Sequence, residues 1–215
     1  LLDLRSGLGF SEDAHFPWVD QDAPAVYYAS DLARTVVRRP RLVEPRGTFR
    51  YNDYAPNLVG LALERATGTR AAAATQALWH ELGAEAAAAW LVDEHGFAWH
   101  ESGFVVTARD LARVGQLVLD GGKVGDRQVA PVAWIERSRD DAGRAVVATF
   151  AGTGLGYRNG WWRLDGDLVA MGRFGQLVVV DPHAGVVIVR LGDGGGDTNV
   201  ALARTLATAA TALSP

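Results

Sequence analysis

Two uninterrupted apolar runs near the C-terminal end constrain the fold of this chain more than any other feature. Residues 177–180 read Leu-Val-Val-Val and residues 186–189 read Val-Val-Ile-Val. Between them lies a turn-forming segment, residues 181–185, with the sequence Asp-Pro-His-Ala-Gly. Short apolar runs rich in β-branched residues are typical of strands that are covered on both faces. The sequence therefore predicts paired strands inside a layered domain.

The hydrophobic period changes along the chain, from mainly helical before residue 142 to strand-like after it. Helices are expected at residues 25–38, 53–66, 70–82, 107–120 and 131–137, with a last one starting at residue 198 or 199. Strands are expected at residues 157–164, 168–174, 176–180 and 186–191. This order predicts an α+β fold. We expect a mainly helical, incomplete lobe over residues 1–141, and antiparallel strands with a C-terminal helix over residues 142–215.

Composition excludes several classes of function. The formal net charge of the 215 residues is −4 without a basic cluster, so we expect no nucleic-acid partner. No apolar run approaches the length of a membrane span. The chain has no cysteine, and His95 and His100 do not have the spacing of a zinc site, so neither a metal nor another cofactor is predicted. The cellular compartment stays open.

Three stretches, taken in their order and spacing, carry a family resemblance. They are residues 1–8 (LLDLRSGL), residues 47–68, which include Tyr51 and end in Thr-Gly, and residues 107–115 (TARDLARVG). Together they resemble the serine β-lactamase-like superfamily, with the class C β-lactamase, esterase and 6-aminohexanoate-dimer hydrolase branches nearest. The resemblance implies a β-lactamase/transpeptidase-like fold, in which a helical lobe accompanies an antiparallel sheet with a C-terminal helix.

The chemistry implied by this resemblance is acyl transfer to a serine. The serine of a Ser-x-x-Lys motif attacks a carbonyl, a tyrosine and the lysine relay protons, and backbone N–H groups hold the oxyanion. Tyr51 falls on the family's tyrosine, and the backbone N–H of Arg173 falls on the strand that supplies an oxyanion donor. Taken alone, Tyr51 could equally anchor a turn, and Arg173 could be an ordinary exposed strand residue.

Three further residues are expected to bind substrate, namely Asp53, Glu101 and Gly172. Asp53 stands where the family has asparagine, and it also suits the N-cap of a helix beginning near Tyr54. Gly172 could instead mark a bulge. Ala170 replaces the family's cationic residue, which favours esters or amides without a carboxylate anchor.

The nucleophile motif does not occur in this sequence. The only lysine is Lys123, and the residue three positions before it is Asp120. The resemblance places Ser-x-x-Lys before residue 1, so we expect an N-terminally truncated serine hydrolase that is inactive by itself. Without the family's lysines, Tyr51 should stay neutral.

We also expect an exposed core in this stretch that promotes self-association. The alternatives are a non-catalytic binding or scaffold protein, and a separate chain that supplies the nucleophile.

Overall fold

The computed structural model describes residues 1–12, 14–17, 20–140, 155–194 and 199–213. The chain divides into two compact units. Unit 1 comprises Leu1–Leu78 and Ala88–Val105, and unit 2 comprises Trp79–Ala87 and Val106–Pro215. Residues 141 and 142 lie outside the described residues, so the lobe boundary expected there stays a prediction.

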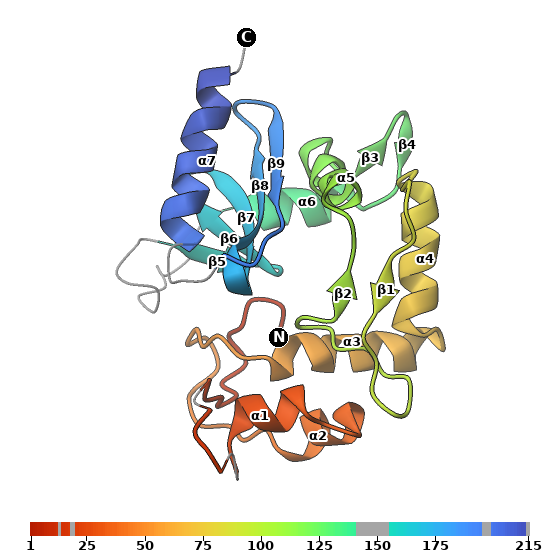
Figure 1. Ribbon diagram of the computed structural model, residues 1–215, viewed down its shortest axis with the longest axis vertical. Helices are drawn as coiled ribbons and strands as arrows, with labels where there is room; N and C mark the ends of the chain where they lie inside the picture. The colour runs from red at the N-terminus through yellow and green to blue at the C-terminus, as the bar shows by residue number, and fades with distance from the viewer. Residues whose placement is uncertain (13, 18–19, 141–154, 195–198, 214–215) are drawn as a thin grey trace. The chain divides into compact units, whose positions relative to one another are not determined.

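Unit 1 is built on a 14-residue helix, α3, which ends at Gly68 in the left-handed conformation that favours glycine. Helix α2 packs against both α1 and α3 (Figure 1). The elements that begin in this unit are α1 (Asp22–Tyr27), α2 (Leu32–Arg38), α3 (Tyr54–Thr67), α4 (Ala71–Glu81), β1 (Ala89–Trp90) and β2 (Phe104–Val105). Strands β1 and β2 form an antiparallel pair.

Tyr54 organises the core of unit 1. Its ring is fully buried and meets the edge of Phe10 at a centroid distance of 5.2 Å. Its hydroxyl donates a 2.6 Å hydrogen bond to Asp22, and Asp22 also accepts from the Ser11 backbone N–H. A buried phenol of this kind needs a partner for its polar end. Tyr54 therefore fixes the N-terminal loop and α1 against the first turn of α3.

The single helix expected at residues 25–38 is two helices. Helix α1 ends at Tyr27, and α2 begins at Leu32 after Asp31 accepts a hydrogen bond from the Arg34 backbone N–H. An aspartate in this position is a standard N-cap, so the second helix starts where its own cap lies. The continuous apolar period concealed this break.

Unit 2 contains a five-stranded antiparallel sheet in the order β5-β6-β7-β8-β9. The strands are β5 (Gly156–Arg158), β6 (Trp161–Leu164), β7 (Asp167–Gly172), β8 (Gln176–Asp181) and β9 (Val186–Arg190). The other elements are α5 (Ala108–Leu119), β3 (Lys123–Val124), β4 (Arg127–Gln128), α6 (Val132–Arg139), the 3-10 turn η1 (Arg173–Gly175) and α7 (Asn199–Leu213). The sheet and its C-terminal helix confirm the predicted α+β class.

Alternate residues of the central strands face different helices. Along β8, Val178 and Val180 belong to a buried cluster with Val118 of α5 and Ile135 of α6. Leu177 and Val179 point to the other face, because side chains alternate along a strand. Helix α7 covers that face (Figure 1). This double coverage explains why the strands are continuously apolar.

None of the helices among the described residues has the length and apolar character that a membrane crossing requires.

Two expected strands end at turns that the hydrophobic pattern did not reveal. The run at residues 157–164 folds back at Asn159 and Gly160, whose φ values are 51° and 86°. Asn-Gly is the preferred pair for such a two-residue hairpin turn, so the signal was present in the sequence. The run at residues 168–174 ends at Gly172, because Phe174 adopts a φ of 60° in η1.

Gly115 lets α5 approach the sheet. A Cβ atom at this position would lie 2.5 Å from a methyl group of Val187 and 3.4 Å from one of Val178. We expect Gly115→Val to lower the free energy of unfolding by about 1–3 kcal/mol, because the added carbons overpack a filled interface. Chemical denaturation followed by circular dichroism measures this change.

The matched control is Gln116→Val, which places the same side chain on the exposed side of the same helix. It should change the free energy of unfolding much less. Equal effects of the two substitutions would show that close packing at Gly115 does not stabilise unit 2.

Candidate active site

The expected site residues fall in both units. Tyr51, Asp53 and Glu101 belong to unit 1, whereas Gly172 and Arg173 belong to unit 2. The structure brings the first three close enough for the charges of Asp53 and Glu101 to act on the phenol of Tyr51.

The start of α3 positions Asp53 without using its carboxylate as the cap. Helix α3 begins at Tyr54, as expected, and Asp53 occupies the N-cap position. The capping bond comes from Asn52, whose Oδ1 accepts from the Ala55 backbone N–H at 2.9 Å. The Asp53 side chain makes no capping bond and accepts instead from the Tyr27 hydroxyl at 2.8 Å. Its carboxylate is therefore held toward Tyr27 and not toward the first turn of α3.

Asn57 connects α3 to the segment that carries Glu101. Its side chain is fully buried, and its amide nitrogen donates to the Asp53 carbonyl at 2.8 Å. Its amide oxygen accepts from the His100 backbone N–H at 3.0 Å. The His100 ring lies so close to α3 that position 60 requires glycine, since a Cβ atom there would lie 2.1 Å from the ring. Glu101 thus follows a residue held directly against the helix.

Tyr51 sits in an acidic, partly buried environment. Burial, followed by the charges of Asp53, Glu12 and Glu101, raises the pKa of the Tyr51 phenol from 10.0 to about 12. All of these effects oppose ionisation, because a phenolate is disfavoured both by desolvation and by nearby negative charge. The phenol is therefore neutral at physiological pH, in agreement with the expectation from the sequence.

Glu101 has the most shifted carboxyl group near Tyr51. Burial, with a smaller effect of the charge of Asp53, raises its pKa from 4.5 to about 7, although hydrogen bonds from the Glu101 backbone, Asn57 and Ser102 act in the opposite direction. Its Oε1 accepts a long hydrogen bond from the Ser102 hydroxyl at 3.4 Å. Its Oε2 is buried without a hydrogen-bond partner among the described residues. A carboxyl group in this state can exchange a proton near neutral pH.

The unit 2 residues lie at the tight turn between β7 and β8. Gly172 is the last residue of β7 and pairs with Gln176, and Arg173 begins η1. The Arg190 guanidinium donates to the carbonyls of Phe174 at 3.3 Å and Gly175 at 2.6 Å. Gly175 has a φ of 78° and a Cβ atom there would collide with that guanidinium. The backbone around Arg173 is therefore held firmly by β9.

Several residues of the site were missed in the sequence. Tyr27 reaches Asp53, and Asn57 reaches the His100 backbone, only through the tertiary fold, and a lone Tyr or Asn carries no recognisable motif. Glu12 follows the first resembling stretch by four residues, and nothing in its local pattern indicates proximity to Tyr51. Among the residues that the structure describes, no group of three or more His, Cys, Asp or Glu side chains is arranged to hold a metal ion.

The comparisons with known proteins identify the family. The family model described as Beta-lactamase matches residues 1–212. The chain therefore belongs to the Beta-lactamase family and is related to its serine hydrolases.

A curated relative and two solved structures illustrate the similarity. The 6-aminohexanoate-dimer hydrolase of Paenarthrobacter ureafaciens is 33% identical over 153 residues, which cover 67% of this chain and 39% of the relative. A Bacillus anthracis protein, provisionally described as a 6-aminohexanoate-dimer hydrolase, has a TM-score of 0.83 and 23% identity. The match covers 99% of this chain and 60% of the Bacillus protein. A penicillin-binding protein homologue from Caulobacter crescentus has a TM-score of 0.67 and 15% identity. The match covers 91% of this chain and 65% of the Caulobacter protein.

The shifted carboxyl group of Glu101 makes the stability of the protein depend on pH. Its pKa is higher in the folded protein than the ordinary 4.5, so the folded state binds this proton more tightly. The contribution of Glu101 is complete below pH 4.5 and is lost as the pH rises through about 7. We expect Glu101→Gln to remove this loss, so that its unfolding free energy falls less between pH 4.5 and 7 than that of the wild type.

Denaturant titrations at several pH values measure the difference between the two proteins. Glu94→Gln is the matched control, because Glu94 is an exposed glutamate of the same segment. If Glu101→Gln and the wild type keep a constant difference across this pH range, the environment assigned to Glu101 is wrong.

Proposed function

We propose that this chain forms part of a serine hydrolase that cleaves an ester or amide through an acyl-enzyme. The observation that carries the proposal is Tyr51, a neutral phenol at the start of α3, in a member of the Beta-lactamase family. A neutral phenol can donate its proton to a leaving group, and the phenolate that a nearby cation stabilises can accept one. Since Ser-x-x-Lys does not occur in residues 1–215, we propose that the nucleophilic serine and its lysine come from outside this stretch.

The acidic surroundings of Tyr51 support a substrate class. Asp53, Glu101 and Glu12 all act on the phenol as negative charges. Such a site disfavours a substrate carboxylate near Tyr51 and favours a neutral or cationic group. We therefore assign substrate binding to Asp53 and Glu101. The name of the Paenarthrobacter relative, a 6-aminohexanoate-dimer hydrolase, agrees with an amide substrate.

The turn between β7 and β8 supplies the proposed oxyanion donor. In this proposal the Arg173 backbone N–H stabilises the negative oxygen of the tetrahedral intermediate, and Gly172 leaves room for substrate beside it. Oxyanion donors need a rigid backbone, because their advantage lies in being oriented before the reaction. The contacts from Arg190 to Phe174 and Gly175 supply that rigidity.

Active-site labelling tests the proposed reaction. The full-length protein should react with a fluorophosphonate probe and hydrolyse nitrophenyl esters, whereas residues 1–215 alone should do neither. We expect Tyr51→Phe to lower kcat/KM by roughly 10²–10⁴, the usual contribution of a general acid–base group. Tyr28→Phe is the control, because Tyr28 is 75% exposed. A full-length protein that contains Ser-x-x-Lys but neither labels nor turns over any ester or amide would refute the proposal.

A non-catalytic role in binding or scaffolding is the second candidate. It is favoured by Ala170, which lacks the cationic group of the family pattern, and by Asp53, which already accepts a hydrogen bond from Tyr27. Determining the coding sequence upstream separates the two candidates. An upstream sequence that lacks the serine or the lysine favours the binding role.

We also propose that residues 1–215 self-associate when produced alone. Among the described strands, β9 pairs only with β8, so its other side is a sheet edge of apolar residues. Exposed edges of this composition recruit further strands. Sedimentation velocity should show the weight-average mass rising with concentration, and a monodisperse monomer at all concentrations would contradict this proposal.

A further inference from the structure

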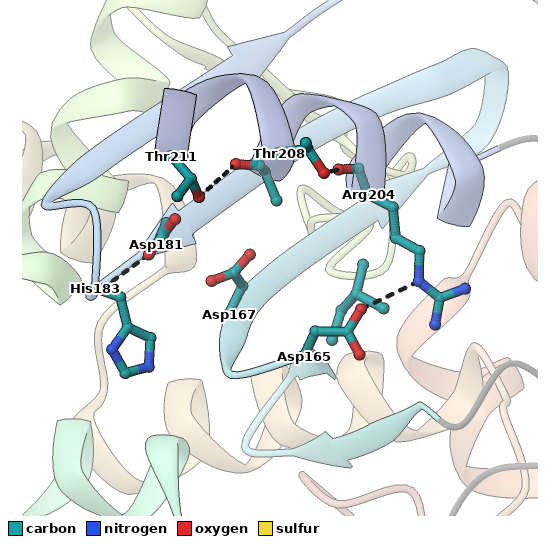
Figure 2. A pocket seen from close by; sticks show the side chains of 9 residues that line it. Asp165, Asp167, Asp181, His183, Arg204, Thr208 and Thr211 are labelled. Carbon is teal, nitrogen blue, oxygen red and sulfur yellow. Dashed lines mark hydrogen bonds and ion pairs between the residues drawn. The ribbon is translucent and has the colours of Figure 1, made fainter. Parts of the chain in front are cut away.

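A polar cavity lies between α7 and the ends of three strands of the sheet, entirely within unit 2, and its lining contains none of the residues assigned above. Its volume is about 280 Å³. Asp165 and Asp167 border it from the turn between β6 and β7, and Asp181 from the end of β8. Thr208 and Thr211 face it from one side of α7 (Figure 2). None of these residues has a role in the proposed hydrolysis.

Two of the carboxylates are buried and incompletely paired. Asp167 is only 6% exposed, and no described residue donates a hydrogen bond to its carboxylate. Asp181 is 4% exposed, and the two backbone N–H groups that it accepts, from His183 and Ala184, both bind its Oδ1 at 2.8 Å. Figure 2 shows the two carboxylates side by side, with Asp167 directed into the space below α7. Three carboxylate oxygens therefore remain available in this cavity.

The two groups also lie on neighbouring strands. Leu168 of β7 pairs with Val180 of β8, and Asp167 and Asp181 are the residues next to this pair. Like charges at adjacent positions destabilise a sheet. Burial, and then the charge of Asp181, raises the pKa of Asp167 to about 6. Two buried carboxyl groups therefore lie at adjacent strand positions beside this cavity.

The cations around Asp167 do not balance this charge. Arg204 of α7 is paired with Asp165 at 3.1 Å. His183 and Arg163 lower the pKa of Asp167, but less than burial and Asp181 raise it. The lining holds three carboxylates and one guanidinium besides the His183 imidazole, so the carboxylates outnumber its cationic side chains even when His183 is counted among them. Buried charges in proteins are normally paired, because an unpaired one is costly.

We infer that this cavity binds a primary ammonium group between Asp167 and Asp181. An ammonium carries three donors on a compact centre, which suits the two oxygens of Asp167 and Oδ2 of Asp181. The hydroxyls of Thr208 and Thr211 donate to the helix carbonyls of Arg204 and Ala207, so toward the cavity they act only as acceptors. A site lined by acceptors fits a donor-only cation. A metal ion fits less well, since the described residues contain no group of three suitable ligands.

The ammonium has two chemically equivalent sources, a free alkylamine and a lysine side chain from another part of the full-length protein. Lys123 is the only lysine in residues 1–215. The experiment therefore uses the full-length protein and has one arm for each source. Both arms read the carboxyl group of Asp167, which is assigned by comparison with Asp167→Asn.

In the first arm, carbon-13 NMR follows the titration of Asp167 with and without n-butylammonium chloride. Tetramethylammonium chloride at the same concentration is the control, because it has the same charge but no N–H donor. We expect n-butylammonium alone to lower the pKa of Asp167 by about 1–3 pH units, the usual effect of a cation in direct contact with a carboxylate. Asp126→Asn, which changes an exposed aspartate of the same unit, should leave this response intact.

In the second arm, a carbodiimide joins carboxyl groups to amines in direct contact, and mass spectrometry locates the cross-link. A link between Asp167 or Asp181 and a lysine of the protein supports the inference with an internal occupant, and Asp167 should then titrate lower than about 6 without added amine. The inference is overturned if no such cross-link forms and n-butylammonium has no effect, or if both ammonium salts lower the pKa of Asp167 by the same amount.

Discussion

The structure depends on one constraint above others, that a buried carboxylate needs hydrogen-bond donors around it. Asp93 accepts from the backbone N–H groups of Leu32, His95 and Phe97. It thereby joins the start of α2 to the turn before His100. Asp110 does the same in unit 2, where it accepts from Glu85 and Ala86. Backbone donors that converge on one carboxylate fix loops that have few apolar contacts of their own.

This constraint also separates structural carboxylates from candidate functional ones. Hydrogen bonds from Glu85, followed by Thr107, Ala86 and Arg113, lower the pKa of Asp110 despite its burial. Glu101 is buried with fewer donors, and its pKa rises. The direction of a pKa shift thus shows whether the fold has satisfied the group. Groups that the fold leaves unsatisfied are the ones available to a substrate or a ligand.

The sequence predicted the fold class because its strongest signals are hydrophobic. The apolar runs of β8 and β9 require two covered faces, and α5 and α7 supply them. The breaks within elements were harder to predict, since Asp31 and the Asn159–Gly160 turn are local signals inside an otherwise continuous pattern. The spacing of apolar residues indicates which face of a helix or strand is buried. It says little about where that element ends.

The site was predictable only as far as local motifs reach. The resembling stretch around Tyr51 located the start of α3, but the direction of the Asp53 carboxylate depends on Asn52 taking the capping bond. The Asp53 carboxylate instead accepts a hydrogen bond from Tyr27, which is 26 residues away in the chain. Likewise, nothing in the sequence around Asp167 indicates burial, because an aspartate beside a Gly turn is normally exposed. Asp167 and Asp181 become neighbours only through the pairing of β7 with β8.

The two unsatisfied carboxyl groups differ in a way that their surroundings explain. Glu101 accepts a long hydrogen bond from Ser102, and its raised pKa lets it become neutral close to physiological pH. Binding a proton therefore neutralises Glu101 at little cost in free energy, and no ligand is required. Asp167 has no donor among the described residues and faces a second buried carboxylate that is already fixed by the turn after β8. Neutralising Asp167 alone would leave Oδ2 of Asp181 without a partner, whereas one cation between them satisfies both groups at once.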